Sequence, residues 1–238
     1  MNEFWEKDLN VGYYDQIVKK GLQNKKGVQS FWHILTLKKV SKYLETNLDH
    51  LDYACGPGTL IGLFSNSNST GIDIAAKQIE YANLNYSNKG VFKKINDYKL
   101  NNKKFDVITI LGLIEFISDD EIIDLVKTLG KNLNDSGKII LTTPNYSGLM
   151  NFYEVLLNKF SDVDYAEEHI NKKNTSNLLS LFKVKDLDNF EFTIKKFMNL
   201  SLFFSIFSHS LSEKIEYFIG NVFKNYFGSL IIVELIKK

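Results

Sequence analysis

Short apolar runs alternate with amphipathic segments between residues 50 and 144 of the chain. The apolar runs predict β-strands over residues 50–54, 69–74, 90–95, 105–111 and 138–143. The segments 75–86 and 118–133 have apolar side chains at helical spacing and therefore predict helices. Strands that alternate with helices at this rhythm indicate βαβ units and a parallel sheet.

Two of these predicted elements carry specific signals. Residues 105–111 are apolar except for Asp106 and Thr109, a pattern typical of a strand buried on both faces of a sheet. Ser118 and Glu121 have the spacing of a capping box, in which each side chain binds the backbone amide of the other residue. The helix that follows is predicted to bury one apolar stripe, formed by Ile122, Leu125, Val126, Leu129 and Leu133.

The pattern on either side of this region is less regular. Apolar side chains at mixed three- and four-residue steps, from Phe31 to Leu44, predict helix in the first fifty residues. After Pro144 we expect helices over 146–160, 177–182 and 211–227, a polar connection over 162–169, and strands over 190–197 and 230–236. Ser210 and Glu213 offer a capping box for the last of these helices.

The composition is that of a folded domain. Of the 238 residues, 44% are hydrophobic and 13% are aromatic, so the chain can bury a sizeable core, and disordered and fibrous classes are excluded. The 29 basic and 28 acidic residues leave a net charge of +1, and the sequence contains no arginine. Because arginine is the usual residue for bidentate contacts to guanine and phosphate, we expect no nucleic acid partner.

Cysteine usage and the apolar runs bear on the compartment. Cys55 is the one cysteine in the sequence, which excludes a disulfide framework and a multi-cysteine zinc site, so we expect no metal. The first ten residues include acidic side chains where a secretory signal needs basic and apolar ones. No run of 18 uninterrupted apolar residues occurs. We therefore expect a cytoplasmic protein.

The residues that point to chemistry follow the predicted strands. Gly56 and Gly58 allow a sharp turn from the first strand into a helix and a close approach of the backbone to a ligand. Asp73 ends the second strand and could accept hydrogen bonds from both hydroxyls of a ribose. Asp97 follows the third strand and could accept one from an exocyclic amine. The carboxyl ends of parallel strands meet at one edge of a sheet, where ligands bind.

A nicotinamide fingerprint fits these residues less well. It requires a third glycine at position 61, where this chain has Ile61. Asp52, within the first strand, would oppose the charge of a pyrophosphate, whereas it suits a ligand that carries an ammonium group. A nicotinamide-dependent reductase is therefore a weaker interpretation.

Five stretches in combination resemble class I S-adenosylmethionine-dependent methyltransferases, and they span roughly residues 30–150. They are residues 52–58, 71–73, 96–98, 105–116 and 137–145. The resemblance implies an α/β, Rossmann-like fold: a seven-stranded, mostly parallel sheet with an antiparallel last strand and helices on both faces. It also implies a single methyltransferase domain over 1–238, with an N-terminal helical cap at 1–48 and acceptor-side insertions at 145–188 and 200–228.

By position, the resemblance assigns the binding of S-adenosylmethionine to named residues. Asp52 and the turn after the first strand would hold the methionine part of the cofactor. The turn residues in question are Ala54, Cys55, Gly56 and Gly58. Ala54 stands where many family members have glycine.

The resemblance assigns the adenosine part to the next two strand ends. Asp73 would accept from the ribose hydroxyls, and Ile74 would pack on the adenine. Asp97 would accept from the adenine amine while Tyr98 lines that pocket. Leu111 would lie near the sulfonium.

Methyl transfer from a sulfonium is an in-line displacement, in which proximity and alignment supply most of the catalysis. An aromatic face favours the sulfonium cation, and Tyr14 is a candidate for that role. A hydroxyl acceptor would also need a general base, and we predict His169. Phe116 stands where small-molecule members of the family often carry histidine. Because the chain has no arginine, a side chain that neutralises the cofactor carboxylate must be a lysine, with Lys38 or Lys39 as the candidates, or else backbone amides must suffice.

The acceptor is inferred from the aromatic-rich segments after the fifth strand and between the last two strands. They lack the basic stripe of a nucleic-acid channel, so we expect a small-molecule or a lipid- or glycan-linked acceptor, methylated at oxygen. Residues 200–227 have three interpretations: core packing, an apolar acceptor pocket, or peripheral contact with a membrane or a second subunit. The pocket would favour a quinone or isoprenoid methyltransferase. A non-catalytic, methyltransferase-like partner protein is the alternative outside the enzymes.

Overall fold

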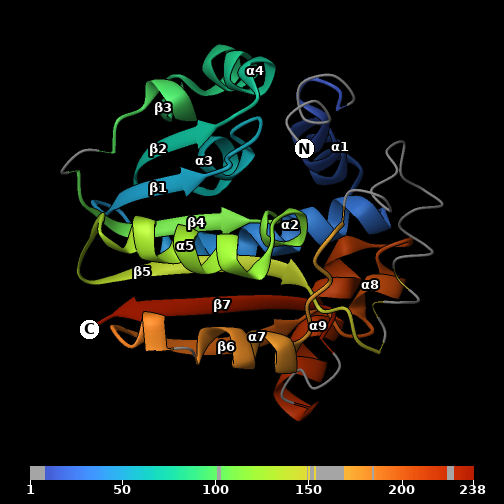
Figure 1. Ribbon diagram of the computed structural model, residues 1–238. Helices are drawn as coiled ribbons and strands as arrows, with labels where there is room; N and C mark the ends of the chain where they lie inside the picture. Colours follow the sequence, from blue (N-terminus) through green and yellow to red (C-terminus); the bar gives the residue numbers. More distant parts are fainter. Residues whose placement is uncertain are drawn as a thin grey trace.

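The computed structural model describes residues 9–100, 103–148, 150, 153, 169–183, 185–223 and 228–238. Its central feature is a seven-stranded sheet in the order β3-β2-β1-β4-β5-β7-β6 (Figure 1). The strands are β1 (Asp49–Tyr53), β2 (Asn68–Asp73), β3 (Gly90–Lys94), β4 (Phe105–Leu111), β5 (Leu133–Pro144), β6 (Phe190–Phe197) and β7 (Leu230–Lys237). β7 lies between β5 and β6 and runs antiparallel to both. The predicted Rossmann-like sheet with an antiparallel last strand is confirmed.

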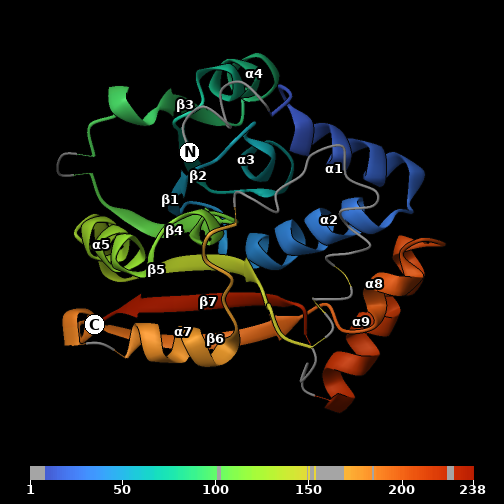
Figure 2. The same cartoon turned by 45° about the vertical axis from the view of Figure 1, so that its right-hand side comes forward.

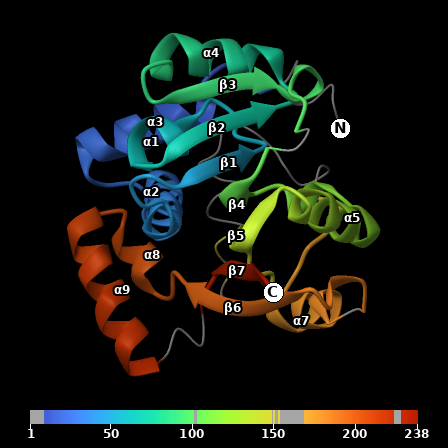
Figure 3. The same ribbon diagram turned by 90° about the vertical axis from the view of Figure 1, so that its left-hand side faces the viewer.

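Helices cover both faces of this sheet. They are α1 (Tyr13–Asn24), α2 (Val28–Val40), α3 (Thr59–Phe64), α4 (Ala76–Tyr86), α5 (Asp119–Gly130), α7 (Thr175–Phe182), α8 (Ser201–Phe204) and α9 (His209–Phe223). Seen along the strand edges, α5 and α7 lie on one side, and α1, α2, α3, α8 and α9 lie on the other (Figure 3).

The side chains of β4 show why apolar residues predominate in this strand. Ile108 and Ile110 point to the face covered by α5 and α7, where they join one core cluster. Val107 points to the opposite face and joins the cluster formed with α1, α2 and α8. Successive residues of a strand face opposite sides, so a strand covered on both faces is mostly apolar. The buried Thr109 is the exception and is hydrogen-bonded to Asp52.

Helix α5 is shorter than its apolar stripe predicts. The predicted capping box is confirmed: the Ser118 side chain accepts from the Glu121 amide, and the Glu121 side chain accepts from the Ser118 amide. The helix ends at Gly130, however, and Leu133 already belongs to β5, paired with Phe105 of β4. The prediction that Leu133 ends the helical stripe was therefore wrong. The pairing of β4 with β5 also shifts register next to Phe105.

Other sequence predictions have mixed outcomes. The first fifty residues are helical, but Lys25 and Gly27, both with positive φ, separate α1 from α2. The predicted helix over 146–160 and the polar connection over 162–169 lie almost wholly outside the described residues.

Helix α9 buries a polar face. The Glu216 carboxylate accepts from the Met198 and Asn199 amides and from the Ser201 hydroxyl, at 2.7–3.2 Å. Leu211 and Phe218, which the sequence places on the apolar side of this helix, are exposed. The capping prediction was wrong, because the Ser208 hydroxyl, rather than Ser210, accepts from the Leu211 amide. Core packing therefore does not explain the apolar side of α9.

In the part of the chain that the structure describes, every helix is too short or too polar to cross a lipid bilayer.

Candidate active site

A cavity of about 250 Å³ opens at the carboxyl ends of the central parallel strands, beside α1 and α2. This volume is near the lower end of the roughly 300–1,000 Å³ of small-molecule sites. Its lining is mostly apolar and includes Leu9, Val18, Trp32, Leu37, Leu60, Leu111, Leu113, Pro144 and Leu230. Three carboxyl side chains interrupt this lining: Asp52, Asp73 and Glu115.

The turn after β1 forms one wall of the cavity. Ala54, Gly56 and Gly58 all have positive φ, at 59°, 51° and 76°. A Cβ at Gly58 would lie 2.6 Å from the Phe92 ring, so this position requires glycine for space as well as for conformation. A Cβ at Gly56, in contrast, would meet nothing within 4 Å, so the backbone at this position is open to a ligand.

Asp73 ties this turn to the end of β2. Its Oδ2 accepts from the Gly56 amide and its Oδ1 accepts from the Ala75 amide, each at 2.8 Å. The carboxylate is buried, with 9% of the residue exposed, and it lines the cavity. These two hydrogen bonds from backbone amides fix the orientation of the Asp73 carboxylate in the cavity.

Asp52 is a buried carboxyl without a cationic partner among the described residues that line the cavity. The Thr109 hydroxyl donates to Asp52 Oδ1 at 2.6 Å. Burial, together with the nearby Asp73 charge, raises the pKa of Asp52 to about 7, although the Thr109 hydrogen bond acts in the opposite direction. A ligand cation would remove this cost of burying the charge.

A chain of buried polar groups holds Thr109 in position. Because the single Thr109 proton goes to Asp52, His50 Nε2 must donate to the Thr109 hydroxyl, at 2.8 Å. His50 Nδ1 lies 2.9 Å from the Ser69 hydroxyl oxygen. Burial lowers the pKa of His50 to about 3, so its ring is neutral.

The structure brings most of the predicted site residues together. Those that line the cavity are Tyr14, Asp52, Ala54, Cys55, Gly56, Asp73, Ile74 and Leu111. Gly58, Asp97, Tyr98 and His169 are outside the lining. Asp97 is exposed on the short 3-10 helix η3 (Ile95–Asp97), and Tyr98 is half-buried directly after it. Their adenine-binding roles stay predictions.

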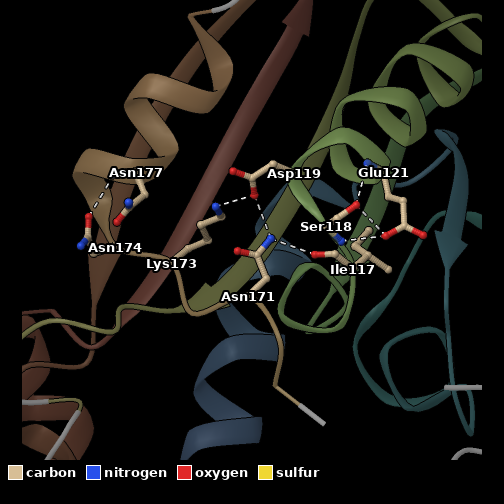
Figure 4. A network of polar contacts seen from close by, with 8 residues as sticks. All are labelled: Ile117, Ser118, Asp119, Glu121, Asn171, Lys173, Asn174 and Asn177. Carbon is tan, nitrogen blue, oxygen red and sulfur yellow. Dashed lines mark hydrogen bonds and ion pairs between the residues drawn. The ribbon is translucent and has the colours of Figure 1, made fainter.

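His169 packs beside the cavity rather than into it. Its ring centroid is 5.0 Å from that of Phe116, and its Nδ1 is 3.2 Å from the Tyr146 hydroxyl. The adjacent segment is anchored to the start of α5 (Figure 4): Asn171 donates to the Ile117 carbonyl and to Asp119, and Lys173 pairs with Asp119. The role of His169 as a base stays a prediction.

The sequence interpretation missed two ionisable groups that line the cavity. His33 lies on α2 with its ring 5.2 Å from that of Tyr14, and burial lowers its pKa to about 4, so it is neutral. Glu115 lies on the 3-10 helix η4 (Ile114–Phe116) and is 3% exposed. Glu115 belongs to the motif after β4, which could have drawn attention to it. The burial of Glu115, however, depends on tertiary contacts.

Tyr14 and Asp15 are neighbours on α1 but have different roles, which the sequence could not distinguish. Tyr14 lines the cavity, whereas Asp15 is fully buried and docks α1 onto α4. Asp15 accepts from the hydroxyls of Tyr81 and Tyr86 at 2.7 and 2.6 Å, and pairs with Lys19 at 2.8 Å.

No lysine side chain occurs in the cavity lining, as far as the described residues show. Lys38 instead pairs with Glu213 of α9, and Lys39 lies over the Phe197 ring. The proposal that either lysine neutralises the cofactor carboxylate is therefore not supported by their positions. Thr59 does line the cavity, and its hydroxyl has no hydrogen-bond partner within the described structure.

The fold and the position of the cavity define a Rossmann-like protein that binds its ligand at the carboxyl ends of parallel strands. Residues 29–191, more than half of the chain, match the family model described as a methyltransferase domain. The chain belongs to this family of methyltransferases, which confirms the resemblance drawn from its motifs. A search of curated proteins finds no match.

Solved structures of methyltransferases share this fold over most of their length. The plantazolicin methyltransferase BpumL, in complex with SAH, is 21% identical, with a TM-score of 0.59 over 100% of this chain and 93% of that one. The magnesium protoporphyrin IX methyltransferase ChlM from Synechocystis PCC 6803, also with SAH, is 13% identical, with a TM-score of 0.62 over 100% and 98%. A SAM-dependent methyltransferase from Archaeoglobus fulgidus is 18% identical, with a TM-score of 0.55 over 86% and 92%.

Proposed function

We propose that the protein transfers a methyl group from S-adenosylmethionine to an oxygen of a small-molecule or a lipid- or glycan-linked acceptor. The observation that carries this proposal is the set of buried carboxyls, Asp52 and Asp73, in a cavity lined without lysine. Structural neighbours crystallised with SAH support the choice of cofactor.

The cavity fits a cofactor of this kind. Asp52 would accept from the methionine ammonium group, and Asp73 from the ribose hydroxyls. The unpartnered Thr59 hydroxyl would donate to the methionine carboxylate. Gly56 and Gly112, where a Cβ would meet nothing within 4 Å, leave room for the ligand against the backbone.

When bound, S-adenosylmethionine would supply a methyl group activated by a positive sulfonium. The protein's contribution is then alignment and exclusion of water. Leu111, Leu113 and Trp32 provide apolar walls of the cavity. Tyr14 presents an aromatic ring to the same space, where it would favour a cation.

Calorimetric titration tests this proposal directly. S-adenosylhomocysteine should bind the purified protein with a dissociation constant in the micromolar range or below, whereas NADH should show no heat of binding. The expected difference follows from Asp52, which suits an ammonium group and opposes a pyrophosphate. Binding of NADH alone would overturn the assignment.

We further propose that α8 and α9 form a peripheral contact surface for an anionic lipid bilayer. Figure 2 shows both helices beside α2 at one end of the sheet. Their exposed apolar side chains are Leu200, Phe204, Ile206, Phe207, Leu211, Tyr217, Phe218 and Val222. None of residues 200–223 lines the cavity, so the position of this surface does not favour the quinone or isoprenoid alternative.

The charges around this surface favour an anionic partner. Both glutamates of α9 are engaged within the protein, Glu213 with Lys38 and Glu216 with backbone amides. Lys214 is exposed on α9, and Lys25 is exposed where its carbonyl accepts from the His209 amide. Exposed aromatic side chains flanked by lysine are typical of helices that lie on a membrane surface.

A vesicle assay tests the surface. The protein should co-sediment with phosphatidylserine-containing vesicles, and much less with pure phosphatidylcholine or at high salt. The double variant Phe207→Ser/Phe218→Ser should bind about tenfold more weakly, because about 1.4 kcal/mol of apolar contact is lost. Leu84→Ser, at an 86% exposed position on α4, is the control and should bind normally. A dimer that the double variant dissociates, with no vesicle binding, would identify a subunit interface instead.

A further inference from the structure

Glu115 is a buried carboxyl that no contact in the described structure fully explains. Its Oε2 is inaccessible to solvent and has no hydrogen-bond partner among the described residues. The residue is 3% exposed and lines the same cavity as Asp52 and Asp73. An unpaired buried polar atom costs about 1–3 kcal/mol, more when it is charged, so a ligand contact at this atom would be favourable.

The surroundings of Glu115 fix its position. Its carbonyl accepts from the Asn171 amide at 3.0 Å, which joins η4 to the anchored segment of Figure 4. The Thr143 hydroxyl at the end of β5 hydrogen-bonds to its carboxyl. A carboxylate held at both its backbone and its side chain is preorganised to bind a donor group.

The carboxyls of the cavity come from different strands of the sheet. Asp52 lies in β1 and Asp73 ends β2, and the proposed function uses both for the cofactor. Glu115 follows β4, which lies on the other side of β1 from β2. No lysine occurs among the described lining residues, and His33 is neutral, so Glu115 has no cationic partner among them.

We infer that Glu115 binds the methyl acceptor, and that the acceptor presents a neutral or cationic O–H or N–H group there and not a carboxylate or phosphate. This inference rests on the proposed function and names the acceptor class for the same site. As the acceptor heteroatom bonds to the methyl carbon, its proton passes to Glu115 Oε2, while the carbon–sulfur bond breaks and its electron pair stays on sulfur.

The protonation behaviour of Glu115 is consistent with this role. Burial raises its pKa to about 7, and the Thr143 hydrogen bond acts in the opposite direction. A general base works best when its pKa lies near the working pH. A hydroxyl acceptor, which must lose a proton during transfer, is therefore compatible with Glu115.

A panel of three probes with one skeleton tests the inference. Benzylamine, benzyl alcohol and benzoate are titrated at pH 8, with and without saturating S-adenosylhomocysteine, and dissociation constants are read by ligand-observed NMR. Benzylamine and benzyl alcohol should bind to the wild-type protein, and benzoate should bind at least tenfold more weakly, about 1.4 kcal/mol. Benzoate binding as tightly as benzyl alcohol would overturn the inference, with no variant needed.

Two variants test whether Glu115 causes the difference in affinity between benzoate and benzyl alcohol. Glu115→Gln should bring benzoate and benzyl alcohol within about threefold of each other, because the repelling charge is removed while the side-chain shape is kept. Its affinity for S-adenosylhomocysteine should stay unchanged. Glu80→Gln, at an exposed glutamate of α4, is the matched control and should keep the wild-type ratio.

The outcomes separate this inference from the proposed function. An unchanged probe ratio in Glu115→Gln would remove Glu115 from the acceptor site even if the cofactor binds. Failure of S-adenosylhomocysteine to bind the wild-type protein would remove the proposed function, and the probe titration without it still decides the role of Glu115.

Discussion

Asp52→Asn should lower the affinity for S-adenosylhomocysteine by about 100-fold while making the ligand-free protein more stable. The loss in affinity follows because a buried, charge-assisted hydrogen bond to the methionine ammonium group is worth about 1.5–3 kcal/mol. An asparagine carbonyl can still accept the Thr109 hydroxyl, so the local network is kept. Calorimetry with S-adenosylhomocysteine measures the first effect.

The gain in stability has a defined pH dependence. The folded-state pKa of Asp52 is raised from 3.8 to about 7, so the folded protein holds the proton where the unfolded chain has lost it. Ionisation of Asp52 therefore lowers the free energy of unfolding as the pH rises between these two pKa values. The loss reaches roughly 4 kcal/mol above pH 7. Asp52→Asn should therefore stabilise the protein at pH 8 and have little effect at pH 4.

Denaturant unfolding of both proteins at these two pH values measures this second effect. A variant that is less stable at pH 8 would show that Asp52 supports the fold rather than the ligand. Unchanged affinity for S-adenosylhomocysteine would remove Asp52 from the ammonium role.

Asp15→Ala should destabilise the protein by about 3–5 kcal/mol, because it leaves a buried ion-pair and hydrogen-bond network without its acceptor. Two tyrosine hydroxyls of α4 donate to this carboxylate, which is fully buried. The same loss should release α1, so its amides should exchange hydrogen faster. Binding of S-adenosylhomocysteine should weaken too, since Tyr14 of α1 lines the cavity.

Lys19→Ala provides the matched control for this experiment. The Lys19 side chain is 38% exposed, so removing its ion pair with Asp15 should cost less than about 1 kcal/mol. Equal destabilisation by the two substitutions would mean that the tyrosine bonds do not dock α1. Denaturant unfolding and hydrogen exchange of α1 distinguish the cases.

The sheet was predictable from the sequence because its signals are local. Mostly apolar runs such as residues 105–111 are typical of strands covered on both faces, and the alternation with helices indicates parallel pairing. The glycine turn was predictable for the same reason, since positive φ at Gly56 and Gly58 depends on the residues themselves.

The features that the sequence did not reveal depend on distant contacts. The inward face of α9 is polar because Glu216 satisfies backbone amides at Met198 and Asn199, a contact that periodicity cannot show. Glu115 is ionisable and lies in an apolar stretch, but its burial follows from the packing of η4 against the segment around Asn171. His33 lines the cavity because α2 crosses the strand ends.

The cavity wall joins residues that are far apart in the order of synthesis. Leu9 precedes α1 and Leu230 begins β7, yet both line the same space. During translation, the strands β1 to β5 can pair before β7 has left the ribosome, because domains fold as the chain emerges. The nascent chain therefore passes through a state in which the sheet exists but the ligand chamber lacks a wall. The ligand chamber is complete only once β7 has been synthesised and has paired with β5.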